Sequence, residues 1–133
     1  MTPLAWLLGL LLPACGADGA SGLPQPALMD MTRIERPATP NTFLAGPAWM
    51  RPEPDVVTEE QKRSAPALYE TAKAVFGGEP GTYVAAEYPA QLQIHYVVRS
   101  AVLNFPDLVT VQVDTAGADR STLVIWSRSV YGR

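Results

Sequence analysis

The sequence contains few of the residues that most often bind metals or perform catalysis. It has one Cys and one His in 133 residues. A single Cys cannot close an internal disulfide, and zinc sites need several Cys or His ligands. No Gly-rich loop opens a helix, and no Ser occupies a Gly-x-Ser-x-Gly elbow. We therefore expect no metal and no cofactor.

Basic charge is also scarce. Ten Lys and Arg stand against 13 Asp and Glu, which gives a formal net charge of −3 and an isoelectric point near 5.0. Nucleic-acid binding needs a basic face, and anionic lipids attract polybasic runs. The basic residues are scattered here, so we expect no nucleic-acid partner.

Long apolar runs are absent except at the N-terminus, where Pro3–Ala14 holds 12 uncharged residues. A membrane-spanning helix needs about 20, whereas a signal-peptide core has this shorter length. Leu12-Pro13-Ala14-Cys15 resembles a bacterial lipobox, with Cys15 as the lipidated residue. No Lys or Arg precedes Arg33. A secretory signal cleaved between residues 14 and 20, or an uncleaved anchor, therefore remains an alternative.

The composition divides the chain into three parts. Residues 1–15 are the signal or lipobox-like segment, the Gly-containing stretch 16–31 is a flexible tether, and 32–133 form one domain. Nine of the 13 Pro precede residue 60, which predicts an extended arm with one short edge strand at 32–36. Phe43, Leu44, Trp49 and Met50 would pin this arm to the domain surface.

One helix is predicted after Ser64, which can cap it, with Pro66 in its first turn. A further short helical turn is expected from Thr58. Apolar residues then recur at helical spacing, and Gly77 and Gly78 would end the helix in the left-handed conformation. The stripe consists of Leu68, Ala72, Val75 and Phe76.

Four segments show strand patterns: 81–87, 92–99, 108–114 and 122–130. In the second, Leu92, Ile94, Tyr96 and Val98 alternate with Gln93, His95, Val97 and Arg99, so the first four form the face that the helix covers. The order predicts an α+β fold: a small antiparallel sheet of about four strands with one helix on a face, preceded by the Pro-rich arm.

Polar residues gather where the predicted strands end. They could form a buried ion-pair network or an anion-binding niche, because guanidinium presents paired planar donors. These residues are Arg99, Ser100, Asp107, Ser127 and Arg128.

His95, the one His, is expected to be a surface or second-layer residue opposite the main apolar row. An envelope hydrolase using His95 with Ser100 or Asp107 is the alternative, although strand alternation puts Ser100 on the other face.

Three segments resemble a bacterial family known as domain of unknown function 1499. They are Arg36-Pro37-Ala38-Thr39-Pro40-Asn41, Arg99-Ser100 with Phe105-Pro106-Asp107, and the stretch from Ser127 to Arg133. The likeness covers 32–133. It implies a small envelope-associated protein without an established activity or catalytic residues. In that family a Ser/Tyr-Asp-x-Gly-x-Asn-Arg stretch and an amphipathic helix follow, whereas this sequence stops at Arg133; a hydrophobic strip of the sheet would then stay exposed.

These observations predict a non-catalytic binding or structural protein of the cell envelope. Its membrane partner would be reached through a lipid on Cys15, and it would be a membrane-anchored lipoprotein or a periplasmic protein. A secreted form, or one held by an uncleaved N-terminal segment, is the alternative location. A truncated remnant without function is a further alternative. Any protein or small-molecule partner is unknown at this point.

Overall fold

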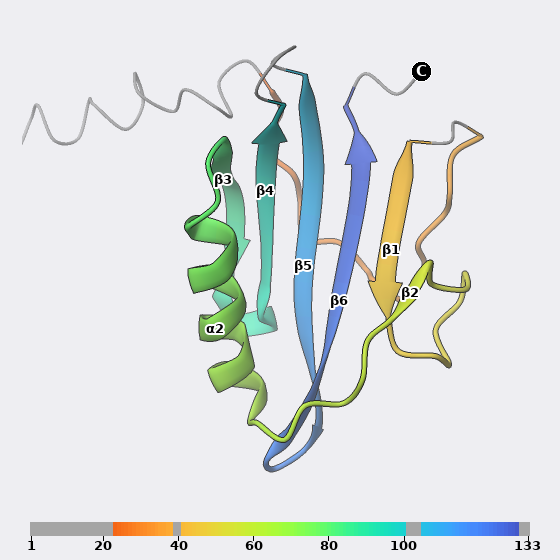
Figure 1. The fold of residues 1–133 in the computed structure, drawn as a ribbon, viewed down its shortest axis with the longest axis vertical. Helices are drawn as coiled ribbons and strands as arrows, with labels where there is room; N and C mark the ends of the chain where they lie inside the picture. Colours follow the sequence, from red (N-terminus) through yellow and green to blue (C-terminus); the bar gives the residue numbers. More distant parts are fainter. Residues whose placement is uncertain (1–22, 39–40, 101–104, 131–133) are drawn as a thin grey trace, which may run out of the picture.

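The computed structural model describes residues 23–38, 41–100 and 105–130. Within them lies one six-stranded sheet in the order β2-β1-β6-β5-β4-β3 (Figure 1). Every neighbouring pair is antiparallel except β1 and β2, which are parallel. The strands are β1 (Thr42–Gly46), β2 (Val56–Val57), β3 (Thr82–Tyr88), β4 (Gln93–Arg99), β5 (Pro106–Gly117) and β6 (Arg120–Ser129). A short 3₁₀ turn, η1 (Pro89–Gln91), joins β3 to β4.

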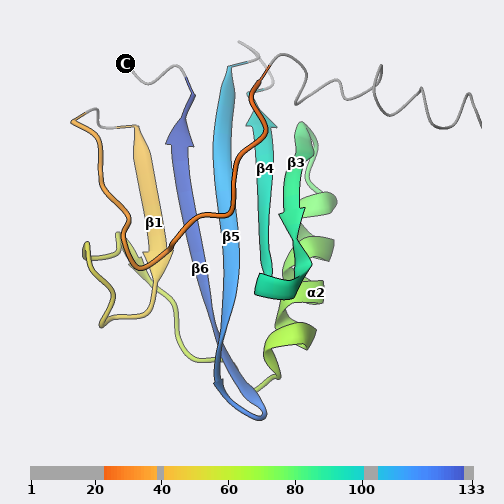
Figure 2. The same cartoon turned by 180° about the vertical axis from the view of Figure 1, so that it is seen from behind.

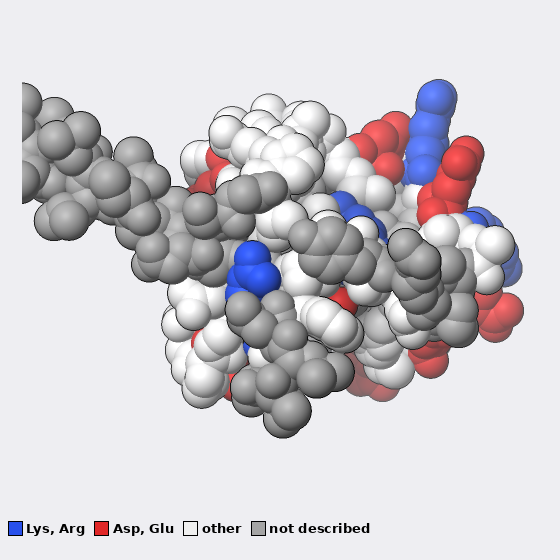
Figure 3. Space-filling view, turned by 90° about the horizontal axis from the view of Figure 1, so that it is seen from above, with Lys and Arg blue, Asp and Glu red and all other residues white. Residues whose placement is uncertain are grey.

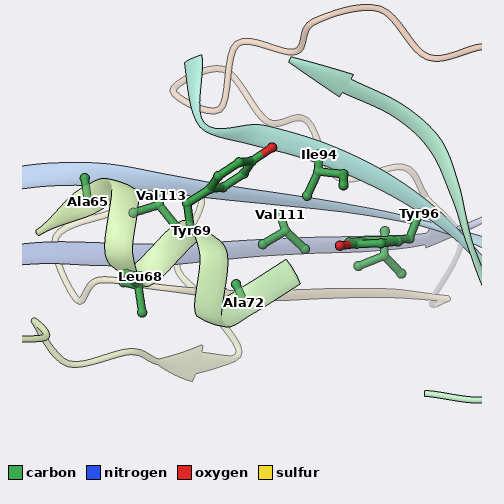
Figure 4. Packing of buried hydrophobic residues seen from close by; sticks show 9 residues of the cluster. Ala65, Leu68, Tyr69, Ala72, Ile94, Tyr96, Val111 and Val113 are labelled. Carbon is green, nitrogen blue, oxygen red and sulfur yellow. The ribbon is translucent and has the colours of Figure 1, made fainter. Parts of the chain in front are cut away.

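Helix α2 (Ala65–Gly77) covers one face of the sheet, on the side of β3, β4 and β5 (Figure 1). Ser64 caps it by accepting a hydrogen bond from the Ala67 N–H at 3.3 Å, as predicted. The Phe76 ring stacks on Tyr96 with centroids 5.3 Å apart, a contact worth about 0.5–1.5 kcal/mol beyond area burial. In Figure 4 Tyr69 and Ala72 of the helix lie toward the labelled side chains of the strands. The buried cluster is Ala65, Leu68, Tyr69, Ala72, Ile94, Tyr96, Val109, Val111 and Val113.

The opposite face is covered by residues 23–38, here called the arm. The arm crosses the back of the sheet over β5 and β6 toward β1 (Figure 2). Its apolar anchors Met31 and Ile34 are 4% and 5% exposed, and they pack with Leu44, Met50, Val124 and Trp126 in a second core. The sheet is therefore covered by a helix on one face and by the extended arm on the other.

The α+β class is confirmed, but the predicted number of strands is wrong: the sheet has six, not about four. The two extra strands, β1 and β2, come from the Pro-rich region that was expected to be irregular. Proline flanks β1 without interrupting it, so the segment can pair with β6 through Thr42–Ala45. The edge strand expected at 32–36 does not form, and these residues lie across the sheet.

Several local expectations also need correction. The short helical turn from Thr58 does not form; Gln61 instead makes an isolated bridge to Ser121. The helix ends without a left-handed Gly, because Gly78 has a φ of −84°. Leu44 and Met50 are buried anchors as expected, whereas Trp49 is 72% exposed.

The described part of the expected tether is held against the sheet. Met31 is buried, and Met29 exchanges two hydrogen bonds with the Gln93 side chain. Packing therefore begins before residue 32. Residues 1–22 lie outside the described residues, so the signal, lipobox and Cys15 predictions stay predictions. Among the described residues, no helix is long and apolar enough to cross a membrane.

Candidate functional site

A continuous row of polar side chains lies under the arm, on the face of the sheet opposite the helix. Gln93, His95 and Thr110 are 0% exposed, although their alternation with the core residues would suit a solvated face. The arm removes them from water. Buried polar groups of this kind are costly unless they are hydrogen-bonded, and the structure satisfies them with one another and with the arm.

The hydrogen bonds in this row run in one direction. The Arg128 NH1 group donates to Thr110 Oγ1 at 2.9 Å, and Thr110 Oγ1 lies 2.8 Å from His95 Nδ1. His95 Nε2 lies 2.8 Å from Gln93 Oε1, and Gln93 Nε2 donates to Gln112 Oε1 at 2.6 Å. Since Gln93 Oε1 can only accept, the His95 proton sits on Nε2 and Thr110 donates to Nδ1. We call these five residues the polar relay.

The relay also fastens the arm. The Met29 N–H donates to Gln93 Oε1, and Gln93 Nε2 donates to the Met29 carbonyl, both at 2.8 Å. The Gln93 amide thus imitates the backbone of a neighbouring strand. Gln112 continues the row by donating to Asp114 at 2.8 Å.

Of the two positions expected for His95, the structure excludes the surface: the ring is fully buried, on the sheet face opposite the main apolar row. Burial, and then the positive charge of Arg128, lower the pKa of His95 from 6.5 to about 4. The ring is therefore neutral at physiological pH. Its hydrogen-bond partners are Gln93 and Thr110, not Ser100 or Asp107. Because His95 and Thr110 are fully buried, a substrate cannot reach this pair, and the geometry does not support the hydrolase alternative.

Arg128 is half-buried at the end of the relay, beside a surface pocket. Burial lowers the pKa of Arg128 to about 10, so the guanidinium stays charged at neutral pH. NH1 makes its second hydrogen bond to the Trp126 carbonyl at 3.2 Å. Among the described residues, no carboxylate forms an ion pair with Arg128.

This pocket, here the arm pocket, has a volume of about 540 Å³. Arg128 and Trp126 contribute to it from β6, and the arm supplies most of the remaining wall. The lining residues are Met29, Arg33, Glu35, Pro37, Trp126, Arg128 and Ser129. In the view from the top end of the sheet, basic atoms form separate spots rather than a continuous patch (Figure 3). A pocket of this volume suits a small ligand.

The five polar residues singled out in the sequence do not converge on one point. Ser100, Asp107 and Ser127 line a groove of about 470 Å³ that also holds Phe43 and Phe105. Arg128 instead points to the arm face, where it contacts Thr110. Neighbouring residues of a strand face opposite sides of a sheet, which separates Arg128 from Ser127. Among the described residues, no ion pair joins Arg128 to Asp107.

In the groove, Ser100 Oγ accepts a hydrogen bond from the Phe105 N–H at 3.1 Å and holds the ends of the loop between β4 and β5 together. Asp107 is exposed, and partial loss of its water shell raises the pKa of its carboxyl. Phe43 and Phe105 are 39% and 59% exposed, so apolar surface is present beside this groove. No group of three or more potential metal ligands occurs in the described part of the chain.

Sequence reasoning missed most of the site. Gln93, Thr110, Gln112, Trp126 and Met29 were not singled out. The available signal was the run of polar residues on one face of two adjacent predicted strands, which indicates either solvent or a buried network.

Comparison with known proteins found no match for this chain. No family model, no curated protein and no solved structure matches it.

Proposed function

We propose that this chain is a non-catalytic envelope protein that binds a small anion in the arm pocket, with Arg128 as the principal contact. The single observation that supports this most is the state of Arg128: a half-buried guanidinium whose hydrogen bonds go to neutral oxygens of Thr110 and Trp126. A desolvated cation is costly unless it is paired. A bound anion would supply the missing charge.

The polar relay also supports the proposal that Arg128 binds an anion. It holds the Arg128 NH1 group in one orientation, which reduces the conformational entropy that a ligand would otherwise have to remove. The relay contains only neutral groups beyond Arg128, since His95 is uncharged, so it does not neutralise the guanidinium.

Titration calorimetry with a panel of small anions tests the binding. We expect at least one oxyanion to bind the wild-type chain, and Arg128→Gln to lose that binding. Arg120→Gln is the matched control, because Arg120 lies on the same strand but is exposed and paired with Glu60 at 2.7 Å. Equal binding by the wild type and Arg128→Gln, or no binding of any anion, would contradict the proposal.

Membership of the domain of unknown function 1499 family and attachment through a lipid on Cys15 are parts of the same proposal. Palmitate labelling in a bacterial host tests the attachment. Label should enter the full chain, disappear in Cys15→Ser, and be reduced when globomycin blocks processing. Unlabelled wild-type protein that still fractionates with the envelope would instead support an uncleaved anchor.

A further inference from the structure

The N–H donors of Arg128 that have no protein partner indicate which class of ligand the arm pocket can bind. A guanidinium carries five N–H donors. The two on NH1 go to Thr110 and to the Trp126 carbonyl. The Nε–H and the two hydrogens on NH2 have no partner among the described residues.

These unused donors belong to a residue that lines the arm pocket. Among the described residues, no side-chain nitrogen or oxygen is both fully buried and without a hydrogen-bond partner. The Nε and NH2 groups are therefore accessible, and Arg128 lines the arm pocket. Nε–H and one NH2 hydrogen point in parallel, which is the fork that a carboxylate fills with its two oxygens.

The rest of the pocket selects among oxyanions. Arg33 and Glu35 contribute opposite charges to the lining, and Arg33 is also paired with Asp30 at 3.6 Å. Counting only the lining residues, Arg33 offsets Glu35, and one positive charge, that of Arg128, is left for a ligand; Asp30 is not among these residues. Met29 and Pro37 provide apolar wall, which would remain in contact with water if the ligand were only a small inorganic ion.

We propose that the ligand is a monocarboxylate with an apolar or aromatic body, bound side-on by the Nε/NH2 edge of Arg128 and packed against Met29 and Pro37. This inference rests on the proposed function and specifies its ligand class. Glu35 disfavours a dianion such as phosphate by like-charge repulsion, and it gives the pocket an acceptor for a hydroxyl or ammonium group on the ligand.

The test compares phenylacetate, hexanoate, acetate and inorganic phosphate by titration calorimetry on the wild-type chain. We expect phenylacetate and hexanoate to bind about tenfold or more tightly than acetate, because they bury additional apolar area. Phosphate should bind more weakly than phenylacetate. Arg128→Lys keeps the charge but loses the fork, so phenylacetate affinity should fall about tenfold or more.

Glu35→Gln is the matched variant for selectivity. Glu35 is exposed, so its replacement should leave the fold intact while phosphate affinity increases relative to phenylacetate. If Arg128→Lys fails to fold, the ¹⁵N shifts of the His95 ring provide a second readout in the wild type. Phenylacetate bound at Arg128 should change these shifts, because Thr110 contacts both Arg128 and His95. Acetate should change them only at higher concentration.

The possible outcomes separate the two proposals. If phosphate binds at Arg128 and the carboxylates do not, the ligand class is wrong and the anion-binding function stands. If acetate binds as tightly as phenylacetate, or Arg128→Lys keeps full affinity, the side-on apolar carboxylate is overturned. If no anion binds, both proposals fail.

Discussion

The neutral, buried His95 makes the protein's stability depend on pH in a predictable way. An unfolded His has a pKa near 6.5, and the folded ring has a pKa of about 4. Above pH 6.5 neither state binds the proton, so the full stabilisation is present. Between pH 6.5 and 4 only the unfolded state binds it, so the free energy of unfolding falls. Below pH 4 both states are protonated and this loss is complete.

The size of the effect follows from the difference between the two pKa values. Each unit is worth about 1.4 kcal/mol, so His95 should remove about 3 kcal/mol of stability between pH 6.5 and 4. That is a large part of the 5–15 kcal/mol by which domains are typically stable. The physical origin is the arm, which excludes the water that an imidazolium would need.

Urea unfolding of the wild type and His95→Gln, measured from pH 7.5 to 4.5, would test this. The carboxyls of Asp30, Asp55 and Glu87 also have lowered pKa values and lose stabilisation in acid, but they do so equally in both proteins. The difference between the two curves isolates His95. Since the chain has one His, its ring signals can also be titrated by NMR without assignment.

The reasoning would be refuted if the His95 ring titrated near 6.5, or if the two proteins lost stability in parallel as the pH fell. A ring protonated on Nδ1 rather than Nε2 at pH 7 would refute the direction assigned to the relay.

Three further predictions concern the arm and the backbone. Gln93→Met should destabilise the fold by about 2–4 kcal/mol, because it leaves the Met29 backbone and the Nε2–H of His95 without partners. Limited proteolysis should then cut the arm before the sheet. Leu44→Ala should cost about 2–5 kcal/mol in urea unfolding, since Leu44 is 0% exposed in the second core, whereas Phe43→Ala on the exposed side of β1 should cost less. Gly81→Ala should destabilise the fold, because Gly81 has a φ of +76° and a Cβ would lie 2.8 Å from the Arg99 carbonyl oxygen. Gly77→Ala should be neutral or slightly stabilising, because open space surrounds Gly77. Thermal unfolding of the two variants would show the contrast.

The helix and the central strands were predictable because their signals are local. Ser64 and Pro66 mark the helix start, and the alternation from Leu92 to Val98 identifies the face that the helix covers. Strand β1 was missed because its five residues lie between prolines, and it becomes a strand only through pairing with β6. The sequence near Thr42 carries no sign of that partner.

The candidate site was less predictable for the same reason. Gln93, His95 and Thr110 have the pattern of a solvated strand face, and their burial depends on Met29, which is 64 residues from Gln93. Arg128 was singled out from the sequence in one cluster with its strand neighbour Ser127, although adjacent residues of one strand face opposite sides of the sheet. Side-chain direction alone would have separated Arg128 from Ser127.

The pairing of β1 with β6 determines the order in which the chain can assemble. β1 is made early in synthesis, but its antiparallel partner is the strand that completes the sheet. The arm precedes β1 and packs on Val124 and Trp126 of that same strand. The antiparallel partner of β1 and the β6 side chains on which Met31 and Ile34 pack are therefore missing until residues 120–129 have been made. The second core can close only after β6 is in place, so the packing of Met31 and Ile34 on it is among the last events of folding.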